Sequence, residues 1–165
     1  MEVAQIRKDT TYMFSQEYKE AIADLFLCWI SLEWRLIACA ECFDKDFARK
    51  IEDGKWPSGI VASNFLDLAR LDTICPDQRL LKAGNLFKDM VKRRNHVFHA
   101  YPCAGARPDV GAISTPDRKV LSQADIESFA DEVAVLHYEF DELLSEYLQP
   151  ATLGGMWIPK VIRSQ

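Results

Sequence analysis

One long stretch with helical spacing, from about Ser15 to Lys50, limits the folds open to this chain. Its apolar residues recur three or four positions apart and form a first stripe: Ile22, Leu25, Phe26, Trp29, Leu36, Ala40, Phe43 and Phe47. A second apolar stripe follows another side of the same predicted helix: Leu27, Ile30, Trp34 and Ile37. Because a single core buries one face of a helix, the second stripe indicates either a deeply central helix or an oligomer interface. We therefore expect a helical protein that forms a homodimer.

Three further helices are predicted after this segment, at about residues 60–71, 76–100 and 122–149. Pro102 disfavours helical geometry at the residue before it, so the second of these helices should end just after His99. Ser122 and Asp125 have the spacing of a capping box and predict the start of the last helix. The pattern predicts an all-α fold, arranged as a single helical domain over residues 1–165.

Two segments fall outside the helical pattern. Residues 102–121 hold several prolines and glycines and predict a long loop, or a hairpin around Pro116-Asp117. Loops of this length inside a compact domain often carry function. The tail, residues 151–165, contains two adjacent glycines and a proline and is expected to be mobile.

Composition excludes several classes of protein. The formal net charge is -5, so contact with nucleic acid must come from a local basic patch. Charged residues interrupt the most apolar stretch, residues 21–43, which argues against a membrane span. The five cysteines include one Cys-x-x-Cys, Cys39 to Cys42, with no second pair or nearby histidine to complete a zinc set. The start of the chain has no apolar run typical of a signal peptide. We expect a cytoplasmic protein without metal or cofactor.

The segment with the clearest chemical character is Arg94-Asn95-His96-Val97-Phe98-His99, which holds two of the three histidines. Histidine exchanges protons near neutral pH, and arginine presents a fixed bidentate charge to phosphoryl oxygens. Such a set suits cleavage of RNA without metal, because the 2′-hydroxyl supplies the nucleophile. Three basic residues beside the segment, Lys88, Lys92 and Arg93, form either an RNA phosphate path or a solvated face.

Arg94 lies on the core-facing side of its predicted helix, where a buried charge needs a partner. Glu33 interrupts the first stripe between Trp29 and Leu36. We therefore predict an ion pair between Glu33 and Arg94, in one chain or across the dimer. A purely structural ion pair is the alternative interpretation. For His99 the alternative is a helix-capping role, and for His96 it is a plain surface position.

The run Arg94-Asn95-x-x-x-His99, near the end of a helix in a small helical domain, resembles the signature of the HEPN superfamily. Tyr101 extends the likeness to Arg-x4-His-x-Tyr, the form found in HEPN toxins paired with antitoxins. The resemblance in layout covers about residues 15–149, and its sharp motif is eight residues long.

The resemblance implies an antiparallel bundle of four to five helices that dimerises. It further implies a metal-independent endoribonuclease of the toxin or phage-defence kind, with RNA as substrate and an antitoxin protein as a further partner. Arg94 would stabilise the phosphate, His99 would act as acid or base, and Asn95 would orient one of them or the substrate. Tyr101, His96 and Glu33 would have supporting roles. The alternative is a non-catalytic HEPN-like helical module that binds a nucleotide or a protein partner.

Overall fold

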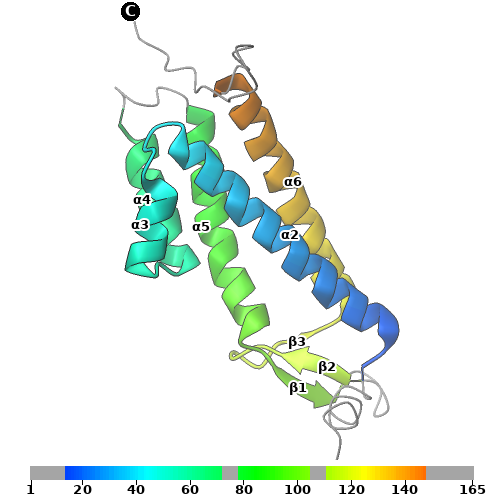
Figure 1. Ribbon diagram of the computed structural model, residues 1–165. Coiled ribbons are helices and arrows are strands. Elements are labelled where there is room, and N and C mark those ends of the chain that lie inside the picture. The colour runs from blue at the N-terminus through cyan, green and yellow to red at the C-terminus, as the bar shows by residue number, and fades with distance from the viewer. Residues whose placement is uncertain (1–13, 72–77, 105–110, 148–165) are drawn as a thin grey trace, which may run out of the picture. The chain divides into compact units, whose positions relative to one another are not determined.

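A computed structural model describes residues 14–71, 78–104 and 111–147 (Figure 1). Helices dominate these ranges, which confirms the predicted mostly helical fold; a small three-stranded sheet is added to it. The elements follow in the order α2 (Gln16–Glu41), α3 (Phe47–Gly54), α4 (Ser58–Ala69), α5 (Gln78–Phe98), β1 (Tyr101–Ala104), β2 (Gly111–Ser114), β3 (Val120–Leu121) and α6 (Gln123–Tyr147). The expected tail at 151–165 and the predicted helix start at Pro76 lie outside the described residues.

The chain divides into two compact units. In its described part, the first unit comprises residues 14–27, 92–104 and 111–132, and holds the sheet. The second comprises residues 28–71, 78–91 and 133–147 and is entirely helical. The single domain and the antiparallel bundle expected from the sequence stay predictions.

The second unit has an aromatic core. The rings of Trp29 and Phe87 stack with their centroids 5.1 Å apart. Phe65 meets Phe140 edge to face at 5.7 Å. Gly84 allows α5 to approach α4 closely, since a Cβ atom there would lie 2.8 Å from the ring of Phe65. These contacts join α2, α4, α5 and α6 of this unit around one interior.

The predicted helix 15–50 is broken, which corrects the sequence prediction. Helix α2 ends at Glu41, and α3 begins at Phe47. In the intervening turn the backbone N–H of Asp44 donates to the Ala40 carbonyl at 2.9 Å. The Asp44 carboxylate then accepts the N–H of Asp46 at 3.3 Å. Aspartate side chains compete with helical hydrogen bonds in this way, which explains why the chain turns here.

The second stripe of α2 is exposed at three of its four predicted positions. Leu27 is 61% exposed, Trp34 60% and Ile30 39%, whereas Ile37 is buried. Burial of Ile37 within the chain leaves Leu27, Ile30 and Trp34 as the exposed part of the stripe, and the dimer stays a prediction. The buried surface of α2 widens near its C-terminal end, where neighbouring residues are also enclosed: Leu36, Cys39 and Ala40.

The described residues of the segment predicted as a long loop or hairpin, together with Tyr101, form an antiparallel sheet in the order β1-β2-β3. Pro102 pairs with Ile113, and Ile113 pairs on its other side with Leu121. Strand β2 is buried throughout. The turn between β2 and β3 contains the predicted Pro116-Asp117, and it closes through a hydrogen bond from the Thr115 N–H to the Lys119 carbonyl at 2.9 Å. Arg118 adopts the left-handed conformation there, with φ of 66°.

Tyr18 joins α2 to this sheet within the first unit. Its hydroxyl donates to the Leu121 carbonyl at 2.9 Å and accepts the Ile113 N–H at 3.0 Å. The side chain is buried, and burial raises the pKa of the phenol. One hydroxyl therefore satisfies two backbone groups that come from neighbouring strands.

Removing this hydroxyl should destabilise the protein. We expect Tyr18→Phe to lower the free energy of unfolding by about 1–3 kcal/mol, because it leaves two buried backbone groups without their partner. Urea unfolding followed by circular dichroism measures the difference. Tyr138→Phe is the matched control, since Tyr138 is 68% exposed. Equal stability of Tyr18→Phe and the control would contradict the structural role of the hydroxyl.

Candidate functional site

The predicted motif lies at the C-terminal end of α5, within the first unit. Arg94 and Asn95 belong to the last turns of the helix, which ends at Phe98. The backbone N–H of His99 still donates to the Asn95 carbonyl at 3.0 Å, so helical geometry continues through His99. The motif is therefore presented by a regular turn and not by an irregular loop.

Arg94 is half-buried and makes two contacts inside the motif. Its Nη1 donates to Asn95 Oδ1 at 2.9 Å, and its Cζ lies 5.2 Å from the ring centroid of Phe98. The Phe98 ring packs in turn against Phe26 of α2, with centroids 5.6 Å apart. The amide and the aromatic ring thus contact the guanidinium directly, and a guanidinium can bind an anion through two parallel hydrogen bonds.

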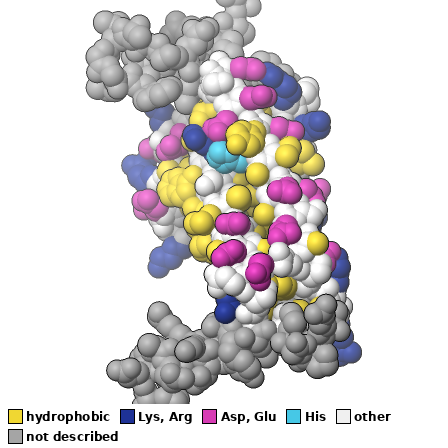
Figure 2. All heavy atoms as spheres, turned by 90° about the vertical axis from the view of Figure 1, so that its right-hand side faces the viewer, with side chains coloured by type: hydrophobic (Ala, Val, Ile, Leu, Met, Phe, Trp, Pro, Cys, Tyr) yellow, Lys and Arg dark blue, Asp and Glu magenta, His cyan; other side chains and the backbone are white. Residues whose placement is uncertain are grey.

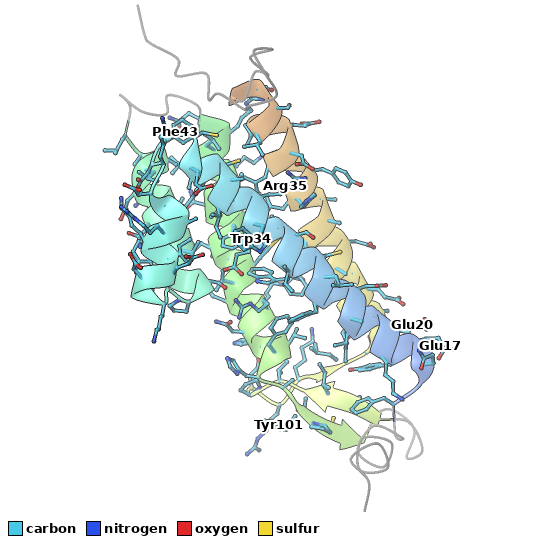
Figure 3. All side chains as sticks on the ribbon, viewed as in Figure 1. Glu17, Glu20, Trp34, Arg35, Phe43 and Tyr101 are labelled. Atoms are coloured by element: carbon cyan, nitrogen blue, oxygen red, sulfur yellow. The ribbon has the colours of Figure 1, made fainter. Side chains whose placement is uncertain are left out.

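The two histidines of the motif are both exposed, as is Tyr101 at the start of β1, which Figure 3 labels. His96 and His99 are three residues apart, so they occupy neighbouring positions on the helix surface. Exposed imidazoles at a helix end are accessible to a substrate. The residues predicted as catalytic or supporting in this segment thus lie at the C-terminal end of α5 or within three residues beyond it.

Arg93 has a more specific environment than the sequence indicated. Both terminal nitrogens of its guanidinium donate to the carboxylate of Glu132 on α6, with Nη2 3.0 Å from Oε1. These bonds lower the pKa of Glu132. Arg93 Cζ also lies 4.3 Å from the ring centroid of Phe129. Glu132 offsets the positive charge of Arg93, while Lys88 and Lys92 are exposed. The phosphate-binding role of Lys88, Lys92 and Arg93 stays a prediction.

Glu33 belongs to the second unit, whereas Arg94 belongs to the first. Within its unit, Glu33 is half-buried and its Oε2 accepts the indole N–H of Trp29 at 3.2 Å. The predicted ion pair between Glu33 and Arg94 therefore stays a prediction.

A pocket that the sequence did not predict lies beside the motif. It has a volume of about 190 Å³, and we name it the hairpin pocket. Its lining comes from the end of α5, the turn between β2 and β3, Leu121 of β3 and the first turns of α6, all in the first unit. Its residues are Arg93, His96, Val97, Thr115, Asp117, Lys119, Leu121, Asp125, Ile126, Ser128 and Phe129. The proline and glycine content of residues 102–121 was the one signal that pointed to this region.

Hydrogen bonds hold the two carboxylates of the hairpin pocket in place. Asp117 Oδ1 accepts the hydroxyl of Thr115, which lowers the pKa of Asp117; its own backbone N–H and the proximity of His96 and Lys119 act in the same direction. Asp125 Oδ2 accepts both the N–H and the hydroxyl of Ser122, at 2.9 and 2.7 Å. The Ser122 hydroxyl lies 3.1 Å from the Asp125 N–H, which completes the predicted capping box.

The part of the chain that the structure describes contains no group of three or more histidine, cysteine, aspartate or glutamate side chains that could hold a metal ion. Cys39 is buried, and burial raises the pKa of the Cys42 thiol to about 11. Across the same described ranges, no helix has the length and apolar character needed to span a membrane.

Figure 2 shows one face of the molecule, on which hydrophobic and acidic side chains are interspersed and basic side chains lie mainly toward the edges. A phosphate backbone is bound by clustered lysine and arginine. Comparison with protein-family models, curated proteins and solved structures finds no match for the chain.

Proposed function

We propose that this protein is a HEPN-like, metal-independent endoribonuclease of the toxin or phage-defence kind. The observation that supports the proposal is the arrangement at the end of α5. There Asn95 and Phe98 hold the Arg94 guanidinium, and the exposed His99 follows in the next turn. A cation in a set orientation and an accessible imidazole are the two groups that this reaction takes from the protein.

In the proposed reaction the 2′-hydroxyl of RNA attacks the adjacent phosphorus, and the bond to the 5′-oxygen of the next nucleotide breaks. His99 removes the proton from the hydroxyl or supplies one to the leaving oxygen. Arg94 donates hydrogen bonds to the phosphoryl oxygens, where negative charge develops. Asn95 keeps the guanidinium from rotating away, which is the orienting role proposed for it.

The proposal includes a homodimer. One chain carries one Arg94-His99 set, whereas attack and departure call for both a base and an acid. Two copies facing each other would supply both. The exposed residues Leu27, Ile30 and Trp34 offer apolar surface of the kind that dimer interfaces bury. An antitoxin protein, if one pairs with this chain, would block the same end of α5.

The chemistry predicts a specific pattern of cleavage. We expect the purified protein to cleave single-stranded RNA in the presence of EDTA, because the nucleophile belongs to the substrate and the charge is supplied by Arg94. A DNA strand of the same sequence should remain intact, since it lacks the 2′-hydroxyl. The RNA products should end in a 2′,3′-cyclic phosphate, which mass spectrometry identifies.

A substrate with a single 2′-deoxy nucleotide at the mapped cleavage position is the sharpest control. Cleavage at that position would contradict the proposed nucleophile. If the protein binds RNA and cuts none of it, the non-catalytic HEPN-like module becomes the better account.

A further inference from the structure

The hairpin pocket adjoins the motif through residues of the same helix. His96 and Val97 line it and stand in sequence between Asn95 and His99. A nucleotide whose phosphate lies at Arg94 and His99 would therefore have a neighbouring base within reach of this pocket. A base-binding role for this pocket rests on the proposed function of the adjoining motif.

The size and lining of the hairpin pocket suit a single heterocycle. Pockets for drug-sized ligands have volumes of about 300–1,000 Å³. At about 190 Å³ this one is smaller and suits one base. Apolar side chains contribute part of its wall, from Val97, Leu121 and Ile126. The rest of the lining is mostly polar, as a base with hydrogen-bonding edges requires.

Arg93 provides a flat surface in this pocket. Its guanidinium lies against the Phe129 ring, and Glu132 binds both terminal nitrogens. The side chain is nevertheless 50% exposed. Single-stranded bases are commonly recognised by stacking on arginine planes. A guanidinium already held in place loses little conformational freedom when a base stacks on it.

The charges of the pocket argue for a base and against a second phosphate. Two carboxylates, Asp117 and Asp125, face one lysine, Lys119, whose Nζ lies 3.8 Å from Asp125 Oδ1. Glu132 offsets Arg93. An anion would meet two carboxylates here, whereas a neutral ring with donors on one edge and acceptors on another could use both signs of charge.

We propose that the hairpin pocket binds guanine of the RNA substrate. Guanine carries two adjacent donors, N1–H and the N2 amine, which match a carboxylate such as that of Asp117. It also carries two adjacent acceptors, O6 and N7, which match a lysine or histidine donor such as Lys119 or His96. Adenine has an acceptor at N1 that an ionised carboxylate would repel. Pyrimidines have a smaller ring face to stack on Arg93.

The test measures binding separately from cleavage. GMP, IMP and AMP are titrated into the full-length His99→Ala protein, and affinity is measured by isothermal titration calorimetry. The three nucleotides share ribose and phosphate, so a difference reports the base. We expect GMP to bind about 5- to 150-fold more tightly than AMP, the range typical of one bidentate base contact. IMP, which lacks the N2 amine, should fall between them. Equal affinity for all three would overturn the inference.

Two variants test whether Asp117 is responsible for the preference for guanine. Asp117→Asn should remove the preference for GMP over IMP, because the amide no longer presents two acceptors to the guanine edge. Asp131→Asn on α6 is the matched control, since Asp131 is exposed and does not line the pocket. A retained preference in Asp117→Asn would count against the pocket.

Cleavage of RNA by the wild-type protein gives an independent readout. If GMP is preferred and no RNA is cut, the pocket stands and the nuclease proposal fails. If RNA is cut with no preference for guanine next to the broken bond, the nuclease proposal stands and the pocket assignment fails.

Discussion

His99→Ala is expected to lower the rate of RNA cleavage by about 10²- to 10⁴-fold, the usual contribution of a general acid or base. Arg94→Ala should cost about 10²- to 10³-fold, because one donor to the developing charge is lost. Arg94→Lys should recover little of the lost cleavage rate, since an ammonium lacks the planar pair of donors. Cleavage of a labelled RNA in EDTA, followed on a gel at single turnover, measures all three.

A matched control distinguishes the specific effect of removing Arg94 from the general effect of removing one positive charge. Arg49 is exposed on α3 and pairs only locally, with Asp46 at 3.1 Å among the described residues. Arg49→Ala should therefore cleave at the wild-type rate. Thermal unfolding of each variant shows whether it is folded. A folded Arg94→Ala protein that keeps full activity would end the nuclease proposal and favour a binding module.

Phe87→Ala is expected to lower the free energy of unfolding by about 3–5 kcal/mol, the range for deleting a buried aromatic side chain. Phe87 is completely buried on α5, and its ring stacks on Trp29. The substitution removes this contact and leaves a cavity in the core of the second unit. Because natural domains are stable by about 5–15 kcal/mol, much of the native state could be lost at 37 °C.

The measurement is chemical denaturation at 15 °C, followed by tryptophan fluorescence and circular dichroism. Leu86→Ala is the control, because Leu86 is the neighbouring residue and is 40% exposed. This substitution should lower the free energy of unfolding much less than Phe87→Ala does. A loss below about 1 kcal/mol in Phe87→Ala would contradict the packing described around Trp29.

Local patterns explain which features could be predicted. A helix with apolar residues three or four apart carries its own signature, and the structure has helices Ser58–Ala69 and Gln123–Tyr147 close to the predicted 60–71 and 122–149. The hairpin turn at Pro116-Asp117 was visible for the same reason, as turn residues act over four positions. The break after Glu41 was missed, because the stripe of apolar residues continues through Phe43 and Phe47, whereas the Asp44 carboxylate binds the Asp46 N–H in the turn between the two helices.

The same distinction between local patterns and distant contacts applies to the candidate site. The sequence placed Arg94, Asn95 and His99 at one helix end, since their spacing within α5 is a local property. It left Arg93 among the phosphate-binding candidates, because its partner Glu132 is 39 residues away. Tyr18 gave no signal at all; its bonds to Leu121 and Ile113 span 103 and 95 residues.

Local patterns are enough to predict that this chain is mostly helical and that one short segment combines a guanidinium with imidazoles. The contacts and surroundings of these groups depend on segments that are distant in the sequence. The hairpin pocket exists because three separate segments meet, and no one of them contains its shape or its balance of charge. Contacts between distant segments depend on how the whole chain packs, so periodicity within a window of a few residues cannot report them.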